Sequence, residues 1–114
     1  MFKAEEAIAE LDKALALSGE LISLYRYEGN VSPRIKAHEV TVNAFVRPVK
    51  NDELVGDIKL TDLVVIISPS GLGGLAPLKK SDKVLVDGRE LNIEIPKPIR
   101  MRNVLVRYTL LARG

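Results

Sequence analysis

Residues 83–95 read KVLVDGRELNIEI and contain the strongest structural signal in the chain. Two stretches rich in aliphatic residues flank the dipeptide Asp87-Gly88. Asp-Gly readily adopts the positive φ angles that a two-residue turn between antiparallel strands requires. The segment therefore predicts a β-hairpin with strands over residues 83–86 and 89–95, and it favours an antiparallel β fold.

Other stretches have the two-residue periodicity of strands. Apolar side chains alternate with other residues over residues 40–46, and aromatic and aliphatic residues do so over residues 21–27. Residues 63–67 form a short, uninterrupted apolar run, which is typical of a strand covered on both faces. A last strand is expected over residues 104–111.

The first part of the chain has a helical pattern instead. Apolar residues recur every three or four positions from Ala4 to Leu15, and acidic residues occupy the first turn, where the helix dipole favours them. The pattern predicts a helix over residues 4–18. Gly19 is expected to end this helix in the left-handed conformation.

The connections between the strands differ in composition. Residues 48–60 contain charges of both signs and few apolar residues, so we expect a long mobile loop. Residues 68–81 contain three glycines, two prolines and regularly spaced leucines, which indicate a short helical turn, and residues 96–103 are expected to be irregular. The sequence predicts one domain over residues 1–114, mainly β, with a small antiparallel barrel or sandwich of five to seven strands over residues 20–112.

Composition excludes several classes of protein. The 114 residues are enough for one domain. Because the chain has no cysteine, disulfides and thiolate catalysis are excluded, and its single histidine argues against most zinc sites. The net charge of +2 is too small to indicate nucleic-acid binding by itself. No apolar run approaches the roughly 20 residues of a membrane span, and the first residues are acidic where a signal peptide is basic. We expect a soluble protein that is made in the cytoplasm.

No residue pattern predicts catalysis, a metal or a cofactor. The glycines between residues 71 and 74 lack the spacing of a phosphate-binding loop. His38 has no identifiable nucleophile near it in the sequence, so a surface position is expected. Two pairs of carboxylates, Asp52 with Glu53 and Asp57 with Asp62, lie in or beside the polar loop, where we expect them to be solvated.

The two ends of the chain differ in charge. Residues 1–30 contain six acidic and three basic side chains, whereas residues 97–114 contain five basic side chains and no acidic one. If the two ends lie on opposite faces, copies of the chain could associate head to tail and close into a ring. The same basic residues also fit a nucleic-acid surface, but single-strand binding proteins combine basic grooves with exposed aromatic residues, and this chain has five aromatic residues in all.

The order of the segments resembles a known family. The chain has an amphipathic N-terminal helix, then DLVVIISPSGL at residues 62–72, KKSDKVLVDGRELNIE at 79–94 and VLVRYTLLARG at 104–114. This set resembles the small head-completion or head-tail joining proteins of long-tailed bacteriophages, prophages and gene-transfer particles. The segment IPKPIRMRN at 95–103 departs from the glycine-rich turn that the family has there.

The resemblance implies a non-enzymatic virion protein made in the cytoplasm of a bacterial host. Copies would form a ring beneath the portal, retain packaged DNA and present a docking surface for the tail, so the implied partners are other copies, portal and tail proteins, and DNA in the channel. A polar loop of this composition cannot offset its ordering entropy without a partner. We therefore expect the partner contact to involve Asp52, Glu53, Leu54 and Val55, and we assign contacts with a neighbouring copy or with DNA to the basic residues Lys97, Arg100 and Arg102.

Two other functions remain open on the sequence alone. A tail-terminator or another tail-ring protein would also be small, β-rich and ring-forming. A small barrel that binds nucleic acid directly belongs to a different class, and its affinity would fall steeply with salt concentration. A hydrolase is not expected, because the chain lacks a recognisable set of nucleophile, base and orienting group.

Overall fold

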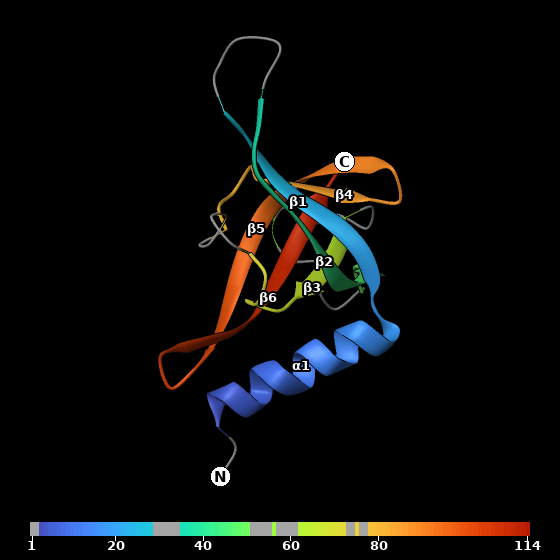
Figure 1. Ribbon diagram of the computed structural model, residues 1–114. Coiled ribbons are helices and arrows are strands. Elements are labelled where there is room, and N and C mark those ends of the chain that lie inside the picture. The colour runs from blue at the N-terminus through green and yellow to red at the C-terminus, as the bar shows by residue number, and fades with distance from the viewer. Residues whose placement is uncertain (1–2, 29–34, 51–55, 57–61, 73–74, 76–77) are drawn as a thin grey trace.

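The computed structural model describes residues 3–28, 35–50, 56, 62–72, 75 and 78–114. In this part of the chain one helix precedes six antiparallel strands, which close into a barrel in the order β1-β2-β3-β6-β5-β4 (Figure 1). The predicted fold class, a small antiparallel barrel with an N-terminal helix, is confirmed. The elements are α1 (Ala4–Ser18), β1 (Glu20–Glu28), β2 (Ile35–Pro48), β3 (Leu63–Ile67), β4 (Lys83–Val86), β5 (Arg89–Met101) and β6 (Val104–Arg113).

Aliphatic side chains from every strand fill the interior of the barrel. Leu24 and Leu110 are completely buried there, and three leucines of the connection between β3 and β4 join the same core: Leu72, Leu75 and Leu78. The Leu75 N–H donates to the Leu72 carbonyl oxygen at 3.1 Å, which agrees with the short turn predicted for this segment. The connection therefore stabilises the barrel through apolar burial as well as joining two of its strands.

Two tight turns join strands of the sheet. Asp87 and Gly88 have φ angles of 50° and 77°, as predicted for the β4–β5 hairpin. Arg102 and Asn103 have φ angles of 51° and 67° and form a second such turn between β5 and β6. The prediction of an irregular segment over residues 96–103 is therefore wrong, because β5 continues to Met101 and only two residues separate it from β6.

Two prolines in the second half of β5 explain this error. Proline removes a backbone N–H and normally argues against a central strand. The pairing of β5 with β6 nevertheless continues through Pro96, opposite Leu110, and Pro98, opposite Tyr108. On the other side, within the described residues, β5 pairs with β4 only as far as Asn92. The two proline nitrogens therefore face this open side, where no neighbouring strand requires a donor.

Gly19 separates α1 from β1 but does not adopt the predicted left-handed conformation. Its φ and ψ angles are −82° and 175°, which are extended, and its N–H donates to the Leu15 carbonyl oxygen at 2.8 Å. Glycine occupies this position because there is no room for a side chain. A Cβ atom at this position would lie 2.5 Å from the Leu15 carbonyl oxygen and 2.9 Å from that of Ala44. The helix and β2 thus approach each other at a point that only glycine allows.

Two buried carboxylates tie the ends of strands together. Asp62 is completely buried and receives two hydrogen bonds from the guanidinium of Arg113, at 2.9 and 2.8 Å. The expectation that Asp62 is solvated is wrong, because the last residues of β6 cover it beside the start of β3. Asp82 is held in the same way by Arg26, at 2.7 and 2.9 Å, and also accepts a bond from the backbone N–H of Lys79.

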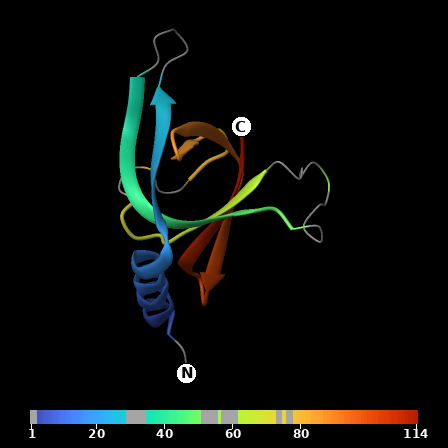
Figure 2. The same cartoon turned by 90° about the vertical axis from the view of Figure 1, so that its right-hand side faces the viewer.

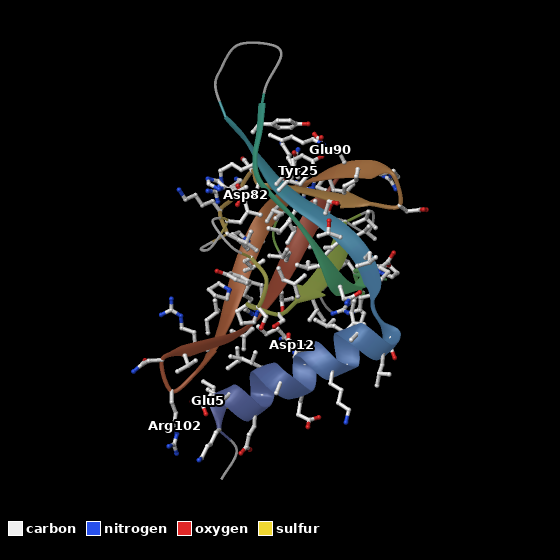
Figure 3. All side chains as sticks on the ribbon, in the orientation of Figure 1. Glu5, Asp12, Tyr25, Asp82, Glu90 and Arg102 are labelled. Carbon is white, nitrogen blue, oxygen red and sulfur yellow. The ribbon has the colours of Figure 1, made fainter. Side chains whose placement is uncertain are left out.

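Helix α1 lies across one end of the barrel, beside the β5–β6 hairpin (Figure 2). Leu15 is its buried anchor, and Asp12 accepts a hydrogen bond from the Ser70 hydroxyl at 3.0 Å. Figure 3 shows Glu5 of the helix and Arg102 of the hairpin at this same end of the molecule. Glu5 and Arg102 therefore do not lie on opposite faces, as the predicted head-to-tail association of the charged chain ends would require.

Candidate functional site

The structure places the predicted basic residues together on one projecting element. Lys97 and Arg100 lie on β5 and Arg102 lies in the turn that follows, and all three side chains are exposed. Arg107 of β6, also exposed, adds a fourth cation to this hairpin. Within the described residues none of these four side chains takes part in an ion pair. We call Lys97, Arg100, Arg102 and Arg107 the basic hairpin.

The other predicted contact residues, Asp52, Glu53, Leu54 and Val55, lie outside the described residues, and so does Asp57. Only the flanks of the predicted loop of residues 48–60 and its Gly56 are described. At the N-terminal flank, Pro48 belongs to β2 and Val49 is buried. At the C-terminal flank, Asp62 is fixed by Arg113. The two points at which this segment meets the barrel are therefore firmly anchored.

An apolar groove lies next to the basic hairpin, on the outer surface of β3, β5 and β6. The volume of the groove is about 320 Å³. Val64 and Leu111 form its floor, and together with Val49 they make up a small second apolar cluster outside the barrel. Ile95 is 47% exposed at the groove, and Lys97 is the one charged residue among the described residues that line it. We call this feature the outer groove; it is lined by Val49, Val64, Ile95, Lys97, Thr109, Leu110 and Leu111.

Sequence reasoning did not find the outer groove, although one signal for it was present. The apolar run of residues 63–67 was expected to be covered on both faces, and Val64 and Ile66 of this run do contribute to the outer apolar cluster. The partners that cover them come from residues 49 and 111, which are far apart in the sequence. Their proximity follows from strand order, which the periodicity of single segments does not determine.

A cluster of polar aromatic residues lies at the other end of the barrel. The hydroxyl groups of Tyr25 and Tyr27 both donate to the same carboxylate oxygen of Glu90, each at 2.6 Å, and the Lys36 ammonium lies 4.3 Å from the centre of the Tyr25 ring (Figure 3). The hydrogen bonds from Tyr25 and Tyr27 lower the pKa of Glu90. Burial, followed by the hydrogen bond to Glu90, raises the pKa of Tyr25. The cluster joins the β1–β2 hairpin to the β4–β5 hairpin.

The Glu90 carboxylate is expected to make stability depend on pH. Because its pKa is lowered in the folded state, its contribution is present at neutral pH and is lost as the pH falls below about 4, through the folded pKa. Urea unfolding of the wild type and Glu90→Gln over this range should show a difference in free energy of unfolding that shrinks with falling pH. Glu10→Gln, on the exposed face of α1, is the matched control and should show no such trend. A constant difference between wild type and Glu90→Gln would contradict the assignment.

The described residues contain no group of three or more metal-ligating side chains, and no helix among them is long and apolar enough to cross a membrane. Comparisons of the chain with protein-family models, with curated proteins and with solved structures found no match. Two exposed features of the described surface remain to be explained, the basic hairpin and the outer groove. Both are contact surfaces.

Strands β5 and β6, which carry the basic hairpin, contain one aromatic residue. Tyr108 is the aromatic residue nearest to it in the sequence, but its side chain is buried in the barrel core, where its hydroxyl oxygen accepts a bond from the Leu78 N–H. Tyr25 is also buried. Proteins that bind single-stranded nucleic acid stack bases on exposed aromatic rings. The rings of Tyr25 and Tyr108 are therefore not available for stacking with bases.

Proposed function

We propose that the protein is a non-enzymatic structural component of the head-tail connector of a bacteriophage or prophage particle, where copies form a ring under the portal and help to dock the tail. The proposal starts from the resemblance of residues 62–114 to head-completion proteins. The observation that carries it is the pairing of an exposed apolar groove with four cations that have no acidic partner among the described residues. Such surfaces bind other macromolecules and do not by themselves perform chemistry.

The two features have complementary roles in this proposal. Apolar area supplies most of the free energy of association, whereas exposed charges orient the partners and accelerate their encounter. The outer groove would therefore hold a partner, and the basic hairpin would direct it or contact DNA in the channel. Residues 52–55 remain a proposed contact with portal or tail proteins.

Deletion of the coding sequence from the genome that carries it tests the proposal directly. Electron microscopy of the particles should then show DNA-filled or leaking capsids without tails, together with free tails, and expression of the protein in trans should restore joined particles. Joined, tailed particles made without the gene would contradict the proposal. Free tails of abnormal length would instead support the tail-terminator role.

Reversal of the basic hairpin is expected to abolish assembly without unfolding the protein. In Lys97→Glu/Arg100→Glu/Arg102→Glu, three exposed cations become acidic, so a partner or DNA phosphates would be repelled, while the core is untouched. Complementation of the deletion measures assembly, and thermal unfolding measures the fold. Lys79→Glu/Lys80→Glu/Arg89→Glu changes the same number of exposed charges elsewhere and should complement normally. Infectious particles from the first variant would refute the assigned role of the hairpin.

A further inference from the structure

The described surface has a second apolar feature besides the outer groove. Leu17, near the end of α1, is 77% exposed, and Leu21, near the start of β1, is 68% exposed. Among the described residues the other two exposed large hydrophobic side chains, Ile95 in the outer groove and Val104, are less exposed, at 47% and 44%. We call Leu17 and Leu21 the junction patch. The two leucines flank the α1–β1 junction, and exposed apolar side chains that gather on a surface are a sign of a contact surface.

The junction patch and the outer groove have complementary chemistry. Most of the described residues that line the groove are valine, leucine or isoleucine, which can accept an aliphatic side chain, and the one charged residue among them is Lys97. The junction patch supplies leucines that project from the chain, with the exposed carboxylate of Glu20 between them in the sequence. A leucine of one copy can thus fill the apolar groove of another copy while Glu20 of the first approaches Lys97 of the second. This pairing of charges favours one orientation of the two copies.

The two surfaces lie on different elements of the molecule. The junction patch is at the α1–β1 junction, on the right-hand edge in Figure 1, whereas β5, which carries Ile95, is on the left. One copy therefore cannot fill its own groove with its own junction patch. When two copies join through two different surfaces, the pair still has one free groove and one free junction patch. The contact can therefore repeat from copy to copy, and it closes into a ring when the rotation between neighbouring copies permits.

We propose that the outer groove of each copy receives the junction patch of a second copy of this chain. The contact is head to tail, with Leu17 and Leu21 of one copy against Val64, Ile95 and Leu111 of the next. This inference rests on the proposed ring-forming function and names the surfaces that build the ring.

The absence of cysteine from the chain allows a specific cross-linking test. The double variant Leu17→Cys/Ile95→Cys carries one thiol in each surface, so oxidation of the purified protein should give a ladder of dimers, trimers and larger species on a non-reducing gel. Each single variant should give no dimer above background, because a head-to-tail contact does not bring two identical positions together. Leu17→Cys/Thr41→Cys, with its second thiol on an exposed position of β2, is the matched control and should give no ladder.

A mixing experiment gives an independent readout on uncross-linked protein. Leu17→Asp/Leu21→Asp retains an intact groove, and Ile95→Asp retains an intact junction patch. In sedimentation velocity, each variant by itself should self-associate with an affinity at least about tenfold lower than that of the wild type, because a carboxylate in an apolar contact loses its hydration. Mixed in equal amounts, the two variants should form dimers and no larger species, since only one productive contact remains.

Three outcomes would overturn the inference. A dimer from Leu17→Cys alone would show that the contact is symmetric, and a ladder from the Thr41→Cys control would show that the cross-links arise from random collision. If the wild type stayed monomeric at all concentrations and the double variant gave no ladder, the copies would not meet at these surfaces. The deletion experiment separates this inference from the proposed function: tailless capsids with no ladder would keep the connector role and reject the contact, whereas a ladder with normally tailed particles would do the reverse.

Discussion

Arg113→Ala is expected to lower the free energy of unfolding by about 3–5 kcal/mol, because it leaves the fully buried carboxylate of Asp62 without its cation. The guanidinium makes two hydrogen bonds to this carboxylate, and alanine replaces neither. Since a domain of this size is stabilised by only about 5–15 kcal/mol in total, the variant should unfold at a much lower denaturant concentration.

Chemical denaturation followed by circular dichroism measures this loss. Arg107→Ala removes an exposed arginine from the same strand and should change the free energy of unfolding by less than about 0.5 kcal/mol. Equal stability of Arg113→Ala and Arg107→Ala would show that Asp62 does not need this partner. The pair joins the residue before β3 to the last residue of β6.

Gly19→Ala is expected to lower the free energy of unfolding by about 1–3 kcal/mol through overpacking. The added methyl group would meet two backbone carbonyl oxygens, those of Leu15 and Ala44, and neither can turn away as a flexible side chain would. Either α1 or β2 must shift. Thermal unfolding of purified protein measures the effect.

Ser18→Ala is the matched control for this substitution, because it changes the neighbouring, exposed residue at the end of the same helix. It should leave stability within about 0.5 kcal/mol of the wild type. If Gly19→Ala were as stable as Ser18→Ala, the close approach of the helix to β2 would not be a constraint on the fold. The position also lies between Leu17 and Leu21, so a shift of α1 should disturb the head-to-tail contact proposed above.

The elements of the barrel were predictable wherever one segment contains the whole signal. The Asp87-Gly88 turn and the bounds of β3 and β4 match the structure, because turn chemistry and short apolar runs are local properties. β2 is longer than predicted: it begins at Ile35, and the register shift of its pairing with β1 lies near His38, which has a φ of 56°. Such a bulge breaks the alternation of side chains that strand prediction uses.

Features that depend on distant residues were not predictable. Pro96 and Pro98 argued against a strand because the sequence does not tell which side of β5 lacks a neighbour. Asp62 was expected in water because its cation, Arg113, is 51 residues away. The basic hairpin was found from the run of cations without acids, whereas the outer groove was missed because its walls come together only when the barrel closes.

The prolines of β5 have a consequence for how copies of the chain avoid misassembly. An exposed strand edge is a template on which another polypeptide can add itself by backbone hydrogen bonding, and that is the route to aggregation. The free side of β5 lacks two of the N–H groups that such an intruder would need. Pro96 and Pro98 therefore make it harder for another polypeptide to add itself along this edge, so the fold limits aggregation at the point where β5 has no neighbouring strand within the described part of the chain.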